Sequence, residues 1–73
     1  MTSLDDQKFL RQIGEKIREL RTARGLTQEQ LGHKCDLHRT FIGSIERGER
    51  NLSILNLRLV AKVLRVEIAD LLR

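Results

Sequence analysis

Residues 27–48, TQEQLGHKCDLHRTFIGSIERG, decide the fold. Thr27 is a good N-cap residue, and Gln30, three positions later, completes the capping-box pattern that marks the start of a helix. Leu31 and Cys35 are four positions apart, so they predict the buried face of one short helix.

A second short helix follows in the same stretch, after a brief turn. His38 can cap it, and Gly48 is typical of a helix end. Phe41, Ile42 and Ile45 lie at spacings that place them on one buried side. Two short helices with inward apolar faces and a short turn between them predict a helix-turn-helix over about 28–47.

The rest of the chain has the same helical periodicity. Before Gly25, apolar residues recur at spacings of four, four and three positions, which predicts a helix with one apolar face. After Gly48, Ser53 is a good N-cap for a further helix. The expected fold is all-α, one domain over residues 1–73, with helices over about 6–23, 28–35, His38 to 47, 54–64 and 67–72. The expected inward residues of the first helix are Phe9, Ile13, Ile17 and Leu20.

Composition narrows the function. One cysteine excludes an internal disulfide, and two histidines with that cysteine fit no zinc spacing, so we expect no metal and no cofactor. No apolar run approaches the roughly 20 residues that span a bilayer, and no signal peptide opens the chain, so we expect a cytoplasmic protein away from membranes. A net charge of +4 favours a polyanionic partner, most simply nucleic acid.

Residues 26–64, LTQEQLGHKCDLHRTFIGSIERGERNLSILNLRLVAKVL, resemble the lambda-repressor/Cro-type helix-turn-helix domains. The resemblance covers about residues 10–72, nearly the whole chain. The part HRTFIGSIERGERNLS is more narrowly similar to the controller proteins of restriction–modification systems. Those are compact dimeric regulators of about this length, so the resemblance implies a dimeric DNA-binding domain.

Four positions depart from the family pattern. Alanine is usual at Gly32, glycine or asparagine at Asp36, tyrosine at Phe41 and proline at Leu52. Aspartate tolerates a left-handed backbone less readily than glycine, and phenylalanine lacks a hydroxyl that could reach the DNA backbone. None of these departures breaks the fold.

The resemblance implies that the helix after His38 enters the major groove. Its outward positions are expected to be Arg39, Thr40, Gly43, Ser44 and Arg47. We expect Arg39, Thr40 and Ser44 to read bases, with Arg39 foremost because a guanidinium can bind guanine O6 and N7 together. The expected phosphate-binding residues are Gln28, His38, Arg47, Arg50, Asn51 and Ser53. Arg50 could instead reach into the groove, and His33 and Lys34 have weaker claims.

Two charged residues are expected to be structural. The resemblance implies a buried ion pair between Arg21 and Glu46, joining the first helix to the end of the third. Cys35 replaces a small apolar residue on an inward face, which favours a buried, inert thiol.

The fourth helix has two apolar stripes. Ile54, Leu57, Ala61 and Leu64 form one, and Leu55, Leu59 and Val63 form another on nearly the opposite side. We expect a homodimer interface over about 54–72, formed by Leu55, Leu59, Val63, Val66, Ile68, Leu71 and Leu72. The alternative is a thicker core under the fifth helix.

The resemblance, together with these apolar stripes, implies a homodimeric transcriptional regulator that binds a palindromic operator in double-stranded DNA, with contact to RNA polymerase left open. A restriction–modification controller fits best. Antitoxin-type and phage-type repressors are alternatives, as is a helical interaction module without DNA binding. An enzyme is not expected, because no paired carboxylates, nucleophile–base pair or phosphate-cradling loop stands out.

Overall fold

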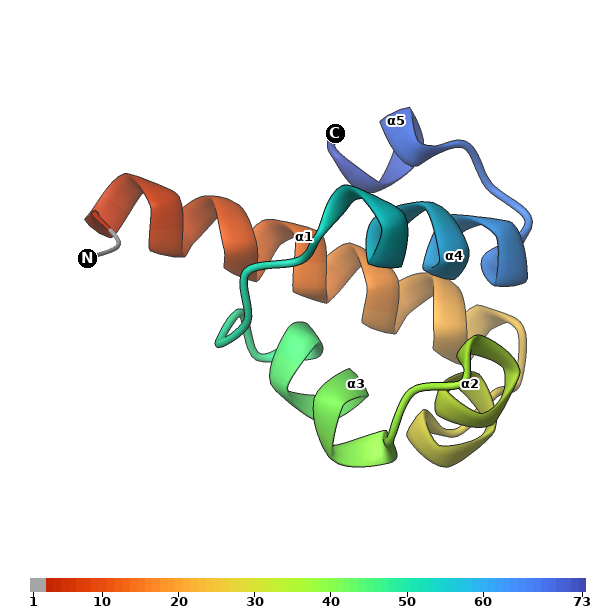
Figure 1. The fold of residues 1–73 in the computed structure, drawn as a ribbon. Helices are drawn as coiled ribbons and strands as arrows, with labels where there is room; N and C mark the ends of the chain where they lie inside the picture. The colour runs from red at the N-terminus through yellow and green to blue at the C-terminus, as the bar shows by residue number, and fades with distance from the viewer. Residues whose placement is uncertain (1–2) are drawn as a thin grey trace.

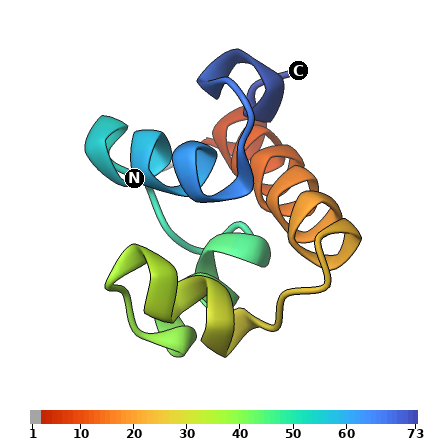
Figure 2. The ribbon, with the colours of Figure 1, turned by 90° about the vertical axis from the view of Figure 1, so that its right-hand side faces the viewer.

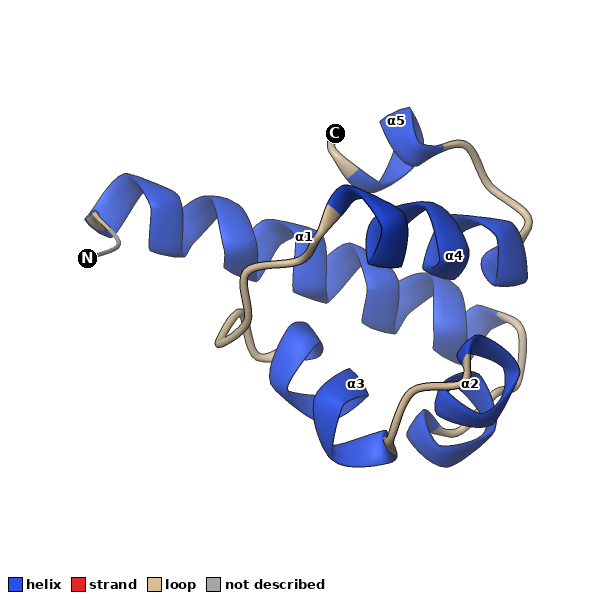
Figure 3. Cartoon of the chain, in the orientation of Figure 1, coloured by secondary structure: helices blue, strands red, loops and turns tan. Residues whose placement is uncertain are grey.

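Five α-helices and no strand make up residues 3–73, the part of the chain that the computed structural model describes. The helices are α1 (Leu4–Ala23), α2 (Gln28–Cys35), α3 (Arg39–Glu46), α4 (Ile54–Leu64) and α5 (Ile68–Leu71). In Figures 1 and 3, α2 and α3 lie below α1, α4 lies in front of α1, and α5 lies above them. The view from the side shows α1 and α4 next to each other, with α2 and α3 packed beneath them (Figure 2). The all-α expectation is confirmed, although the first two residues of the expected domain lie outside the described part.

The helix starts follow from local side-chain chemistry. Thr27 Oγ1 accepts from the Gln30 amide at 3.0 Å, and Gln30 Oε1 accepts from the Thr27 amide at 2.9 Å. Ser53 caps α4, as expected, and Ser3 caps α1, which begins at Leu4, two residues before the expected start. At the start of α3, His38 Nδ1 accepts from the Thr40 amide at 3.1 Å, so the imidazole replaces the usual hydroxyl or carboxylate cap.

Two helix ends place a non-glycine residue in the left-handed region. Asp36 has φ 55° after α2, and Arg65 has φ 59° after α4. In both cases the next residue's amide bonds back to a carbonyl five residues earlier, Leu37 to Gly32 at 2.8 Å and Val66 to Ala61 at 3.0 Å. Asp36 therefore holds the backbone conformation that glycine would hold more easily.

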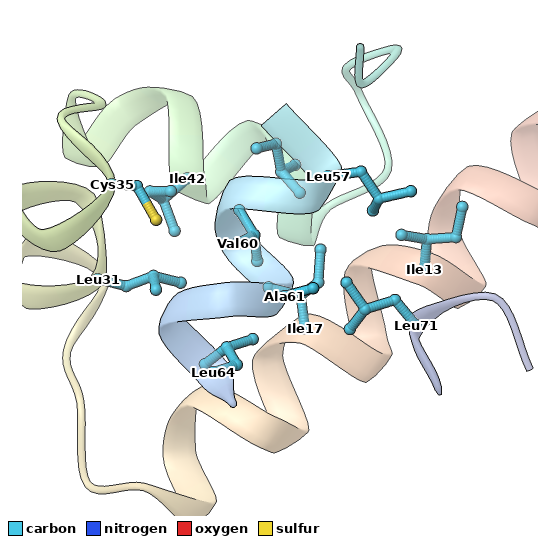
Figure 4. Packing of buried hydrophobic residues seen from close by; sticks show 11 residues of the cluster. Ile13, Ile17, Leu31, Cys35, Ile42, Leu57, Val60, Ala61, Leu64 and Leu71 are labelled. Carbon is cyan, nitrogen blue, oxygen red and sulfur yellow. The ribbon is translucent and has the colours of Figure 1, made fainter. Parts of the chain in front are cut away.

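The core draws on all five helices (Figure 4). Its buried apolar side chains are Ile13, Ile17, Leu31, Cys35, Ile42, Ile45, Leu57, Val60, Ala61, Leu64 and Leu71. Phe9 was expected to face inward, and Ile54 was placed in the same stripe as the core residue Leu57, but they are 47% and 68% exposed. The first part of α1 extends past the helices that cover its later turns (Figure 1). Phe9 therefore follows the spacing of the core residues, but it is only partly covered by other helices. Ile54 is the first residue of α4, one turn before the helix meets the core.

The crossing of α1 and α3 depends on Gly14. A Cβ at this position would lie 2.7 Å from the Glu46 carbonyl oxygen and 2.9 Å from its carbonyl carbon. Backbone packs on backbone here, and any side chain would push the end of α3 away from α1. Gly32 serves the α2–α3 pair in the same way, because a Cβ there would lie 2.5 Å from the Leu37 carbonyl oxygen. The space is therefore smaller than the family's usual alanine needs.

Candidate DNA-binding surface

A buried polar cluster fixes the end of α3. Arg21 donates from Nε to Glu46 Oε2 at 2.6 Å and from Nη2 to Glu46 Oε1 at 3.0 Å. Arg21 Nη1 also donates to the Leu26 carbonyl at 2.7 Å. Gln28 Nε2 donates to Glu46 Oε1 at 3.0 Å, so one carboxylate connects α1, α2 and α3. The Arg21 and Glu46 side chains, which the resemblance pairs, are 10% and 3% exposed.

Gln28 and Gly43 lie differently from their expected positions. Because Gln28 Nε2 bonds to Glu46, its amide group is already engaged within the protein. Gly43 was expected to face outward, but it is buried. A Cβ at this position would lie 3.4 Å from Gln28 Oε1 and 3.1 Å from Arg47 Nη1. These two side chains cover the glycine, so it does not face outward.

The first turn of α3 presents Arg39 and Thr40. Both are exposed. Arg39 Nη1 donates to Glu29 Oε2 of α2 at 2.9 Å, and the two side chains are 63% and 72% exposed. Thr40 Oγ1 lies 2.8 Å from His38 Nδ1. Ser44, one turn later, is half-buried and donates its hydroxyl to the Phe41 carbonyl at 2.7 Å. Of the three residues expected to read bases, Arg39 therefore has the most unused donors.

Basic side chains continue into the loop after α3. Arg47 is exposed and its Nε lies 3.1 Å from Glu49 Oε1. The Arg50 guanidinium lies over the Phe41 ring, 5.0 Å from its centroid, which ties the loop back to α3. Asn51 and Ser53 are exposed, as is the imidazole of His38. These residues flank α3 in the sequence, on either side of the helix that the resemblance places in the major groove.

The residues expected at a dimer interface divide into three groups. Leu55 and Leu72 are exposed, at 70% and 45%. Four others are half-buried and pack against the core: Leu59, Val63, Val66 and Ile68. Leu71 is 1% exposed and belongs to the core of the single chain, so its expected place on the interface is corrected. The fifth helix is too short for periodicity to separate its two faces.

Two features are absent from the part of the chain that the structure describes, a cluster of metal ligands and a membrane-spanning helix. Residues 3–73 contain no group of three or more potential metal ligands. None of their helices is both long enough and apolar enough to cross a bilayer. Cys35 is buried, and desolvation raises the pKa of its thiol, which keeps the thiol protonated and unreactive.

Comparison with known proteins identifies close relatives. The helix-turn-helix family profile matches residues 17–71. Control protein C.BamHI of Bacillus amyloliquefaciens is 47% identical over 61 residues, which cover 82% of this chain and 75% of that protein. Control protein C.SmaI of Serratia marcescens is 43% identical over 60 residues, with 82% and 71% covered. The crystal structure of the restriction-modification controller protein C.AhdI from Aeromonas hydrophila matches with a TM-score of 0.82 and 44% identity, over 85% of this chain and 94% of that one.

Proposed function

The chain belongs to the helix-turn-helix family of DNA-binding transcriptional regulators, and we propose that it is the controller protein of a restriction–modification system, acting as a homodimer on a palindromic operator. Its relatives are regulators rather than enzymes. The observation that carries the proposal is the exposed first turn of α3, which begins with Arg39. The buried Arg21–Glu46 pair fixes the other end of this helix to α1.

Base reading falls to Arg39, Thr40 and Ser44 in this proposal. The Arg39 guanidinium binds guanine O6 and N7, a contact worth about 1–3 kcal/mol of discrimination against other bases. Thr40 lies beside it at the entry to the groove. Ser44 has donated its hydrogen to Phe41, so its hydroxyl oxygen contributes as an acceptor.

Phosphates on either side of the groove are bound by the start of α2 and by the loop after α3. At the start of α2, the positive end of the helix supports binding by Gln28, whose amide group must turn away from Glu46 or share its hydrogens. The other phosphate-binding residues are His38, Arg47, Arg50, Asn51 and Ser53. Such contacts set the register of the protein on the duplex and do not read sequence.

A homodimer through α4 and α5 would present two copies of α3 to successive major grooves. We define the α4–α5 surface as Leu55, Leu59, Val63, Val66, Ile68 and Leu72. Exposure of Leu55 and Leu72 beside half-buried aliphatic neighbours supports an interface here. A two-fold dimer of this family contacts half-sites about 34 Å apart, one helical turn of DNA.

Selection from random duplexes tests DNA recognition. The wild-type chain should enrich a two-fold symmetric site, and Arg39→Ala should lose preference for that site over random DNA. Arg73→Ala is the matched control, because Arg73 follows α5 on the other side of α1 from α3 and carries the same charge. Unchanged preference in Arg39→Ala would remove this residue from the base-reading surface. Failure of the wild type to enrich any duplex would favour the helical interaction module.

Sedimentation at micromolar concentration tests the dimer. The wild type should sediment as a dimer and Leu55→Glu as a monomer, because a charge would be buried in the interface. Leu4→Glu is the control, since Leu4 is equally apolar and 75% exposed, but lies at the start of α1. A wild-type chain that stays monomeric with and without DNA would refute the dimer.

A further inference from the structure

The exposed contact between Glu29 and Arg39 has no evident role in folding. Arg39 Nη1 donates to Glu29 Oε2 at 2.9 Å, from the first residue of α3 to the second residue of α2. Exposed ion pairs of this kind contribute little to stability. The two helices are already fixed by buried Leu31, Cys35 and Ile42 and by the close approach at Gly32. The contact therefore matters chiefly for where the Arg39 guanidinium lies.

We propose that Glu29 determines specificity by holding Arg39 so that it binds a guanine edge in preference to a phosphate. The inference rests on the proposed function, in which Arg39 reads a base. Glu29 would then be a positioning residue that acts through the arginine and need not contact DNA itself.

The hydrogen-bonding capacity of the guanidinium supports this role. Arginine has five N–H donors in a planar fork. In the described part of the chain, Arg39 uses Nη1 for Glu29, and Nε and Nη2 have no protein partner. The free Nε–Nη2 edge matches the paired acceptors O6 and N7 of guanine, so the arginine can read this base without leaving Glu29.

A phosphate is a poorer target for the same pair. A phosphate oxygen that binds Arg39 while the ion pair persists lies near the Glu29 carboxylate, and the two negative charges repel. If the arginine leaves Glu29 to bind the phosphate, the carboxylate remains unpaired beside a polyanion. In both cases Glu29 makes binding of Arg39 to a DNA phosphate less favourable than binding to guanine. Specificity then arises because the phosphate contact is disfavoured.

Glu29→Gln tests the proposal, because glutamine keeps the length of the side chain and removes its charge. The probes are a duplex carrying the site enriched by the wild type and a mixed-sequence duplex of equal length without it. The variant should bind the mixed duplex more tightly, and the ratio of the two affinities should fall about five- to tenfold, part of the discrimination that a bidentate arginine supplies. Unchanged circular dichroism and urea unfolding would show that the fold is retained.

Two further variants separate this effect from a simple change of net charge. Glu15→Gln removes the same charge from α1, beside Arg73 and away from α3, and should leave the affinity ratio unchanged. In an Arg39→Ala background, where the preference for the site is already lost, Glu29→Gln should raise the affinity for the mixed duplex less than it does with Arg39 present, because the residue through which Glu29 acts is absent. A ratio that does not fall in Glu29→Gln, or a gain in affinity for the mixed duplex that is as large with Arg39 absent, would overturn the inference. If the wild type enriches no site, the proposed function fails instead, and with it the premise.

Discussion

Replacing Arg21 by methionine should destabilise the chain strongly, because it removes one partner of a buried ion pair. The change leaves the Glu46 carboxylate, whose side chain is 3% exposed, with Gln28 as its remaining donor. An unpaired buried charge of this kind costs about 3–5 kcal/mol. At about 0.05–0.15 kcal/mol per residue, a chain of 73 residues has a free energy of unfolding of about 4–11 kcal/mol. The substitution should therefore remove a quarter or more of the stability.

Urea unfolding followed by circular dichroism measures this loss, at one protein concentration because a dimer would add a concentration dependence. A loss of 3 kcal/mol corresponds to a fall in Tm of roughly 12 °C or more for a domain of this size. Glu46→Leu should cost a similar amount, because it leaves the arginine buried without its carboxylate. The double variant, Arg21→Met with Glu46→Leu, should recover much of the loss, since two apolar groups of similar volume leave no buried charge.

The exposed pair provides the control. Arg39→Met removes the same kind of group from a contact of similar length, but both partners are well over half exposed. It should change the free energy of unfolding by less than about 1 kcal/mol. The reasoning is refuted if Arg21→Met also costs less than about 1 kcal/mol, or if the double variant is as unstable as the sum of the two single variants.

Three further outcomes can be measured on the same chain. Arg65→Gly should raise the free energy of unfolding by about 0.5–1 kcal/mol in urea, because glycine adopts the left-handed conformation at φ 59° without strain; no gain would contradict this. Gly14→Ala should lower it by about 1–3 kcal/mol or more, since the new Cβ meets the backbone of α3; a loss below 0.5 kcal/mol would show that the crossing can widen. Cys35 should react with iodoacetamide only after unfolding in urea, because it is buried and desolvation raises the pKa of its thiol; rapid labelling of the native chain would contradict this. Because the pKa of this thiol is higher in the folded chain than the unfolded value of about 8.5, its contribution to stability is complete below that pH and is lost as the pH rises further. The free energy of unfolding of Cys35→Ala should therefore fall less at alkaline pH than that of the wild type.

Features that depend on a few neighbouring residues could be predicted from the sequence. The capping residues Thr27 and Ser53 act within one helical turn, so their role is visible in the order of the residues. The helix-turn-helix follows from the helix starts at Thr27 and His38 and from the apolar spacing after each. Family resemblance added the Arg21–Glu46 pair, which spans 25 residues and which periodicity alone does not reveal.

Features that depend on how the helices meet could not be predicted. The need for Gly14 comes from the α1–α3 crossing, and nothing near it in the sequence indicates that a carbonyl group lies above it. Phe9 continues the apolar face of α1, but periodicity does not show where the covering helices stop. The Glu29–Arg39 contact joins residues ten positions apart across a turn whose shape is set by the left-handed Asp36.

The two arginine–glutamate pairs show how burial assigns different consequences to the same chemistry. Arg21 and Glu46 are almost fully excluded from water, so separating them is expensive and the end of α3 has one position relative to α1. Arg39 and Glu29 lie in solvent, so their contact adds little to stability and directs the arginine while its other donors stay free. A recognition helix needs both properties, a backbone that does not move and a leading side chain that is directed but still able to bind a base. In the proposed regulator, the buried pair supplies the first and the exposed pair supplies the second.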